Sequence, residues 1–178
     1  MTNEKPKKDE WAEPSEPPKC LWMSGEMVDW ENATVHASML GWSSISMVFE
    51  GIRGYWNSDQ EQLNIFRLDS HLERLMRSMK VMRMTSPWSV EELTSAVIDI
   101  AQTNEFRGDC YIQPLAYFGE GTPGYLSAGG RPGEVAIFSR KSTSILGAGE
   151  TITCGVSSWS RISDNVMPPR VKAIANYQ

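Results

Sequence analysis

The chain has 178 residues, of which 40% are hydrophobic and 22% are charged, and its formal net charge at pH 7 is −5. This composition is typical of a globular protein, and the length fits one domain or one domain with part of a second. The negative net charge argues against a surface that binds nucleic acid or membranes, and no apolar run reaches the roughly 20 residues of a membrane-spanning helix. The three scattered cysteines fit a reducing cytoplasm better than a disulfide framework or a zinc site.

The first part of the chain predicts a flexible tail followed by an antiparallel sheet. Residues 1–19 are rich in Pro, Lys and Glu, which is typical of a solvated tail. The segment CLWMSGEMVDW has two short apolar runs around a Ser-Gly pair, the pattern of a β-hairpin. SMVFEGIRGYW and LNIFRL predict further strands, the second because apolar and polar residues alternate.

Two helices are predicted after these strands. In DSHLERLMRSMKVMRM the apolar residues recur on one helix face, and Asp69 or Ser70 is the expected N-cap. In SPWSVEELTSAVIDIAQTNEF, Ser89 with Glu92 three residues later predicts a capping box ahead of an apolar stripe.

The rest of the chain predicts strands again, at CYIQPLAYF, EVAIFSR and TITCGVSS, with a Gly/Pro-rich loop between the first two. Strands, then two helices, then strands indicate an α+β fold rather than alternating βαβ units. We therefore expect a small α/β domain at 20–140, an interdomain linker at 141–150, and the first strand and helix of a second, incomplete domain at 151–178.

Two side chains are candidates for cofactor chemistry. Lys172 lies between Val171 and Ala173, so its amine could be partly withdrawn from water and could condense with a carbonyl; pyridoxal phosphate is the commonest cofactor held in this way. The alternative is an ordinary surface lysine. Arg74 lies on the polar side of its predicted helix and could bind a phosphate with paired hydrogen bonds, or could simply face solvent. His71 is interpreted as a packing or capping residue.

Other features are less specific. Gly51 allows the backbone to approach a ligand closely, although a glycine in a strand more often marks a bulge. Tyr111, Gln113 and Tyr117 share one strand face and could line a polar pocket or form the solvent-facing side of a sheet. No segment has the pattern of a phosphate-binding glycine loop, a metal cluster or a Ser-His-Asp triad, so no metal is expected.

Five segments, taken together, are more informative than any one residue. They are SGEMVDWENATVHA, VFEGIRGY, IFRLDSHLERLMRSMKVMRM, YIQPLAYFGEGTPG and SSWSRISDNVMPPRVKAIANY. In this order and spacing, from about Leu21 to the last residue, the chain resembles the branched-chain amino-acid aminotransferases, which are class IV pyridoxal-phosphate enzymes. The most specific feature is Lys172 followed by Asn176 and Tyr177, with a Trp-Arg pair upstream.

The resemblance implies the small N-terminal domain of the fold type IV enzymes, followed by the start of the second domain. It implies that Lys172 carries pyridoxal 5′-phosphate as a Schiff base, that Arg74 holds the cofactor phosphate and that Tyr177 binds its phenolic oxygen. The implied reaction moves the amino group of leucine, isoleucine or valine to 2-oxoglutarate. Small-molecule amino and 2-oxo acids are then the partners, in a cytoplasmic homodimer or larger homo-oligomer.

The resemblance also places Phe49, Gly51 and Tyr111 in the substrate pocket. It further implies that the chain is truncated just after the Schiff-base lysine, so that this stretch alone should be inactive.

Three features depart from the family pattern. Gln113 stands where the family usually has an arginine for the distal carboxylate of glutamate, Ser44 and Ile45 replace a Tyr-Gly pair, and the substrate-side loop GEGTPGY is its own variant. Gln113 keeps open an aminodeoxychorismate lyase, a D-amino-acid aminotransferase or an amine transaminase, and a non-catalytic fragment is a further alternative. A neutral amide predicts weaker discrimination between 2-oxoglutarate and pyruvate, unless another arginine such as Arg53 restores it.

Overall fold

The structure is a computed structural model that describes residues 17–119, 131–142, 151 and 153–177. In these residues the helices are α1 (Leu40–Ser46), α2 (Leu68–Val81) and α3 (Val90–Thr103), with short 3₁₀ helices η2 (Trp30–Asn32), η3 (Ala37–Met39) and η4 (Ile174–Tyr177). The strands are β1 (Cys20–Met23), β2 (Glu26–Asp29), β3 (Val48–Phe49), β4 (Ile52–Asn57), β5 (Gln62–Ile65), β6 (Met84–Thr85), β7 (Cys110–Phe118) and β8 (Arg131–Lys141).

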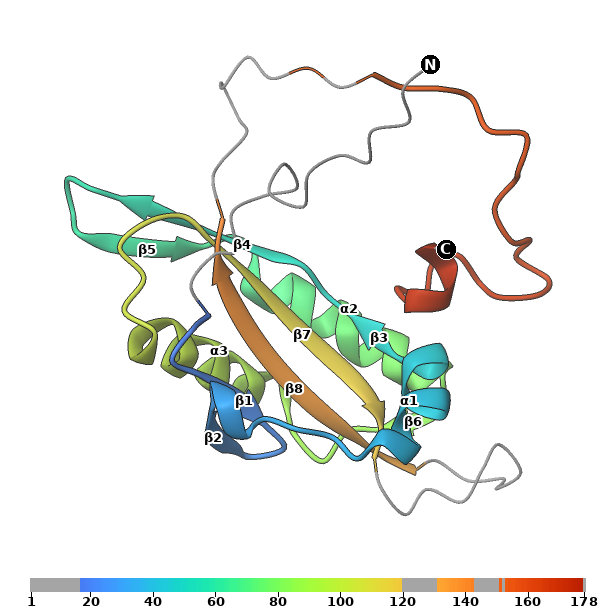
Figure 1. The fold of residues 1–178 in the computed structure, drawn as a ribbon, viewed down its shortest axis with the longest axis horizontal. Coiled ribbons are helices and arrows are strands. Elements are labelled where there is room, and N and C mark those ends of the chain that lie inside the picture. The colour runs from blue at the N-terminus through green and yellow to red at the C-terminus, as the bar shows by residue number, and fades with distance from the viewer. Residues whose placement is uncertain (1–16, 120–130, 143–150, 152, 178) are drawn as a thin grey trace, which may run out of the picture.

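The strands form one sheet in the order β2-β1-β8-β7-β4-β5, with β3 paired to β7 and β6 paired to β8. Among the pairings of the described residues, only the short β6–β8 pairing is parallel. The long strands β7 and β8 run through the middle, and α2 and α3 lie against one face (Figure 1). This arrangement of helices on one face of a mainly antiparallel sheet confirms the predicted α+β class.

The core lies between this face of the sheet and the two helices. Alternate residues of β7 and β8 point into it and are fully buried, as are the apolar stripes of α2 and α3. The buried residues are Ile112, Ala116, Val135 and Ile137 from the strands and Leu72, Leu75, Met79, Leu93, Val97 and Ile100 from the helices. Because strand side chains alternate between faces, Tyr111 and Gln113 point to the face away from the helices.

Several predicted elements are confirmed. The first hairpin turns at Ser24 and Gly25, which both have left-handed backbone angles, φ 49° and 105°. Such angles at both central residues suit a tight two-residue hairpin turn. At the start of α3 the Ser89 hydroxyl accepts the Glu92 N–H, and the Glu92 carboxylate accepts the Ser89 N–H, so the capping box forms as predicted.

The predicted start of α2 was wrong. The N-cap is Arg67, with φ 47°, and not Asp69 or Ser70. Phe66 is still tied to β4 through its N–H bond to the Arg53 carbonyl, and Arg67 then turns the chain directly into the helix. Asp69 therefore lies inside the first turn, where its charge complements the positive end of the helix.

The strand predicted at TITCGVSS was also wrong, because residues 151 and 153–158 have no strand conformation. Their alternating pattern has no neighbouring strand to pair with in the described part of the chain, and Val156 is fully exposed. Within residues 153–177, the helix that forms is the short η4. Helix α1, which was not predicted, comes from a stretch without a clear helical period. Most of the predicted linker, 143–150, and the loop residues 120–130 lie outside the described residues.

Candidate functional site

Lys172 is fixed at the edge of the sheet by its own backbone. Its carbonyl accepts the Phe49 N–H at 2.9 Å, and Ala173 forms a β-bridge with Val48. Val171 and Ala173, on either side, are buried in the core with exposures of 1% and 0%. Since alternate side chains of an extended segment point in opposite directions, the two apolar neighbours direct the half-buried Lys172 side chain away from the core.

The amine of Lys172 lies between two aromatic rings. Its Nζ is 4.1 Å from the ring centroid of Phe49 and 4.5 Å from that of Tyr177, and it donates a hydrogen bond to the Tyr177 hydroxyl at 3.1 Å. The two rings pack edge to face with their centroids 5.3 Å apart. Ring contacts of this kind favour a cation and limit the positions that the lysine can take.

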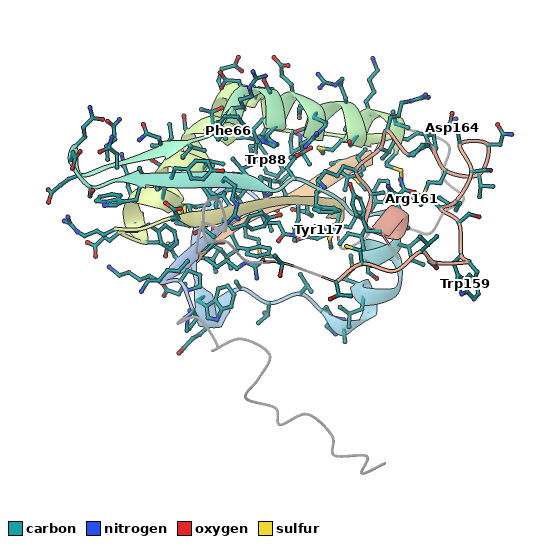
Figure 2. All side chains as sticks on the ribbon, turned by 90° about the horizontal axis from the view of Figure 1, so that it is seen from above. Phe66, Trp88, Tyr117, Trp159, Arg161 and Asp164 are labelled. Atoms are coloured by element: carbon teal, nitrogen blue, oxygen red, sulfur yellow. The ribbon has the colours of Figure 1, made fainter. Side chains whose placement is uncertain are left out.

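Tyr177 is held in turn by the residues before it. The Arg161 guanidinium donates to the Asn176 carbonyl at 2.6 Å and lies 5.3 Å from the Tyr177 ring centroid. The Asn176 side-chain amide donates to the carbonyls of Val171 and Pro168. Figure 2 shows Arg161 beside the short C-terminal helix, whereas Trp159 extends outward. Asn176 and Arg161 therefore position Tyr177 next to the lysine.

A buried ion cluster holds Arg74. The Glu50 carboxylate, which is 0% exposed, accepts Arg74 Nε and Nη2 through its two oxygens, each at 2.6 Å. His71 Nδ1 lies 2.9 Å from the second oxygen. The hydrogen bond with Glu50 is the main cause of a raised pKa at Arg74, so the guanidinium stays charged. The Arg74 side chain is 45% exposed, and its Nη1 group takes no part in the contacts of Nε and Nη2 with Glu50 and His71, so it can meet a ligand.

The arginine and the lysine belong to the same region of the molecule. The Lys172 N–H donates to the Ser78 hydroxyl at 3.4 Å, and Ser78 lies one turn after Arg74 on α2. Tyr177 is close enough to contribute, after Glu50, to the raised pKa of Arg74. The structure thus brings together Lys172, Tyr177 and Arg74, which are far apart in the sequence.

The four residues predicted for the substrate pocket share one face of the sheet region. Phe49 pairs with Leu115 of β7, which puts it on the same face as Tyr111 and Gln113. The Tyr111 hydroxyl lies against Gly51 so closely that a Cβ there would be 2.0 Å from it. Gly51 is therefore required for close approach and not for a bulge. Tyr117, in contrast, is buried, and desolvation with a smaller contribution from Glu134 raises its pKa.

Sequence reasoning missed Glu50. A carboxylate between an apolar strand and a glycine is the signal that could have found it, because buried acidic residues are almost always paired. His71, interpreted as a packing or capping residue, is a partner of this carboxylate.

The assembled groups suit an organic cofactor better than a metal. An amine can bond to a carbonyl, a guanidinium can hold a phosphate and a fixed hydroxyl can bind a phenolate oxygen. Over the described ranges, no group of three or more His, Cys, Asp or Glu side chains could hold a metal ion. The described helices include none that is long and apolar enough to cross a membrane.

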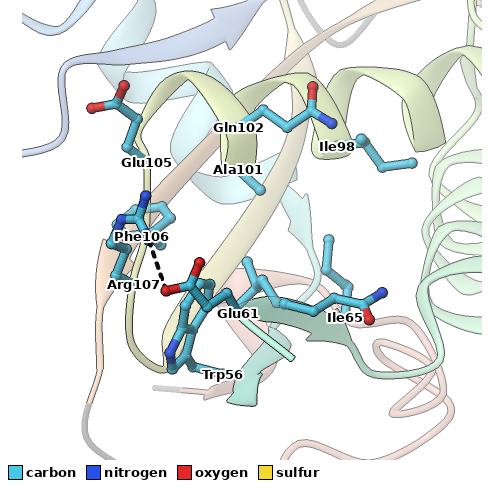
Figure 3. Close-up of a pocket in the computed structure, with 11 residues that line it drawn as sticks. Trp56, Glu61, Ile65, Ile98, Ala101, Gln102, Glu105, Phe106 and Arg107 are labelled. Atoms are coloured by element: carbon cyan, nitrogen blue, oxygen red, sulfur yellow. Dashed lines mark ion pairs between the residues drawn. The ribbon is translucent and has the colours of Figure 1, made fainter. Parts of the chain in front are cut away.

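One hollow lies away from these residues. It measures about 560 Å³ and lies between the β4–β5 hairpin and the end of α3, where Glu61 and Arg107 form an exposed ion pair (Figure 3). None of the predicted site residues lines it. A smaller hollow of about 280 Å³ is lined by Arg161, Asn176 and Tyr177, and the Tyr177 hydroxyl accepts the hydrogen bond from Lys172. Of the predicted site residues, Tyr177 is the one that lines this smaller hollow.

A family model decides the assignment. The model described as "Amino-transferase class IV" matches residues 47–177, a range that includes every predicted site residue. The chain belongs to the class IV aminotransferase family.

Relatives that resemble the chain include branched-chain aminotransferases. A probable branched-chain-amino-acid aminotransferase of Aquifex aeolicus is 34% identical over 158 residues, which is 88% of this chain and 50% of the relative. The solved pyridoxal-phosphate form of the enzyme from Thermobaculum terrenum is 44% identical with a TM-score of 0.83, over 91% of this chain and 52% of that one. The enzyme from Thermoproteus uzoniensis, solved with norvaline, is 36% identical with a TM-score of 0.78, over 90% of this chain and 52% of that one. The chain spans about half the length of the relatives it matches.

The buried ion cluster predicts a difference between two arginines of α2. Arg74→Ala leaves Glu50 buried with only His71 as its partner, which should lower the free energy of unfolding by about 3 kcal/mol or more. Arg77 pairs with Glu73 at 3.6 Å on the exposed side of the same helix, so Arg77→Ala should cost at most about 1 kcal/mol. Urea denaturation of both variants measures the difference, and equal losses would contradict a structural role for the cluster.

Proposed function

We propose that this chain is the Lys172-bearing part of a pyridoxal-phosphate-dependent aminotransferase that moves the amino group of leucine, isoleucine or valine to 2-oxoglutarate. The observation that carries the proposal is the Lys172 amine held 3.1 Å from the Tyr177 hydroxyl, in the region where Arg74 is fixed by buried Glu50. The names of the similar enzymes support the donor class. The proposal for the acceptor rests on the resemblance read from the sequence.

The cofactor fits the groups present. Solved relatives include a form with pyridoxal phosphate and a form with pyridoxamine 5′-phosphate. When bound, the cofactor supplies the electron sink that makes the α-hydrogen of the substrate acidic. In this chain Lys172 would link to it, Arg74 would bind its phosphate and Tyr177 would hydrogen-bond its phenolic oxygen.

The protein's own part in the reaction is to position groups and to move a proton. With the cofactor bound, the Lys172 Nζ would act as the base that takes up and returns the proton of the substrate α-carbon. The hydrogen bond to Tyr177 and the contact with Phe49 keep this nitrogen near the reacting atoms. Tyr111 and Phe49 offer apolar surface to an aliphatic side chain, which suits a branched-chain donor.

A second candidate within the family is a D-amino-acid or amine transaminase or a lyase. The observation that favours it is Gln113, a neutral amide on the substrate face. Comparing L-leucine, D-alanine and an aliphatic amine as donors separates these functions, because only the first is a substrate of the enzyme that we propose.

The domain division, the location and the assembly are also proposals. We retain a small domain at 20–140, a linker at 141–150 and the start of a cofactor domain at 151–178, with Lys172 and Phe49 in contact near the junction. A homo-oligomer in the cytoplasm is what the resemblance and the scattered cysteines favour.

Chemical labelling tests the role of Lys172. Borohydride reduction of the full-length protein loaded with pyridoxal phosphate, followed by peptide mapping, should attach the label to Lys172, because a Schiff base is reduced to a stable secondary amine. Label on a different lysine, for example Lys141, would refute the assignment.

Cofactor retention tests the role of Arg74 separately from its effect on folding. In full-length variants shown by circular dichroism to be folded at low temperature, Arg74→Ala should raise the dissociation constant of pyridoxal phosphate roughly ten- to a hundredfold, the effect of losing a charge-assisted bidentate contact. Arg77→Ala should change it little, since that side chain is paired to Glu73. Equal dissociation constants would refute a phosphate-binding role.

A further inference from the structure

A row of three side chains crosses the substrate face of the sheet. Tyr111 of β7 is the direct register partner of Arg53 on β4 and of Arg140 on β8. Partners in adjacent strands project from the same face, so the two arginines flank the tyrosine on its two sides. Gln113 and Phe49 project from this same face.

The two arginines carry charges that the described residues do not neutralise. The Arg140 guanidinium carbon lies 5.2 Å from the Tyr111 ring centroid, so the ring supports it without an acidic partner. Arg53 donates to the Ser142 hydroxyl, which is neutral. Asp109, the acidic residue just before β7, accepts the backbone N–H of Trp56 instead. No ion pair to Arg53 or Arg140 forms within the described part of the chain.

This row continues toward Lys172. The Tyr111 hydroxyl lies against Gly51, two residues after Phe49, whose ring contacts the Lys172 amine. Phe49 pairs with Leu115, which lies four residue steps along β7 from Tyr111, a distance of about 13 Å along the strand. The long side chains of Lys172 and Arg140, with a short diacid between them, can span that distance.

We propose that Arg140, supported by the Tyr111 ring and assisted by Arg53, binds the distal carboxylate of a dicarboxylic amino or 2-oxo acid. The inference rests on the proposed aminotransferase function and deepens it. A planar guanidinium binds a carboxylate with two parallel hydrogen bonds, and a pair of unneutralised guanidiniums is an environment that favours a second negative charge on the substrate. The consequence reverses the expectation drawn from Gln113: the preference for 2-oxoglutarate over pyruvate is kept, through a residue on a different strand.

Binding of unreactive acids tests this inference without relying on turnover. In the full-length protein loaded with cofactor, calorimetry compares glutarate, which has two carboxylates, with butyrate, which has one. The native protein should bind glutarate more tightly. Arg140→Gln should raise the dissociation constant of glutarate roughly ten- to a hundredfold, the loss expected for a charged bidentate contact, and leave that of butyrate unchanged. Arg140→Lys keeps the charge without the planar guanidinium. Its dissociation constant for glutarate should therefore lie between those of the native protein and Arg140→Gln.

The matched control is Arg107→Gln, an exposed arginine outside the candidate site that should alter neither dissociation constant. No glutarate preference in the native protein, or equal weakening of both acids by Arg140→Gln, would overturn the inference. The ratio of kcat/KM for 2-oxoglutarate and pyruvate, measured with leucine as donor, should fall by the same factor in Arg140→Gln. A protein that transfers no amino group to either acceptor would refute the proposed function, whereas the glutarate measurement would still decide the role of Arg140.

Discussion

The buried carboxylate of Glu50 is the interaction on which the arrangement of the site depends. A carboxylate without exposure to water is strongly unfavourable unless hydrogen bonds and opposite charge compensate it, and here Arg74 and His71 of α2 do so. The backbone N–H of Glu50 donates a hydrogen bond to the Pro114 carbonyl of β7. Glu50 therefore joins the junction of β3 and β4 to both the central strand and the helix, and it fixes which edges of the Arg74 guanidinium remain available.

One face of the sheet forms the hydrophobic core, and the other face carries the residues of the candidate site. The face toward α2 and α3 is filled by aliphatic side chains, so polar and aromatic residues of β7 must project from the other face. The segment that carries Lys172 joins the sheet through β3, with Val171 and Ala173 buried on either side of the lysine. The same alternation that builds the core therefore delivers Lys172, Phe49 and Tyr111 to a common region.

Local sequence patterns were sufficient to predict those elements whose formation depends on interactions between residues close in the sequence. The capping box of Ser89, the first hairpin and the strand of Tyr111 were predicted because their signals lie within a few residues of one another. Two predictions were wrong because longer-range contacts decide them. A hydrogen bond from Phe66 to β4 sets the N-cap of α2, and the segment TITCGVSS has no strand to pair with among the described residues. Lys172, Arg74 and Tyr177 came from an ordered resemblance. Glu50 and Arg140 could not be found in that way, since their partners are set by tertiary packing and strand register.

The central claim is that Glu50 acts on the cofactor through Arg74, and a double-mutant cycle on the dissociation constant of pyridoxal phosphate tests it most directly. In the full-length protein, Glu50→Gln should weaken cofactor binding when Arg74 is present, because the arginine loses its fixed orientation. In the Arg74→Ala background the same change should have almost no effect, giving a coupling energy of about 1 kcal/mol or more. Additive effects of the two substitutions would contradict the account, because Glu50 would then act independently of the arginine that it holds.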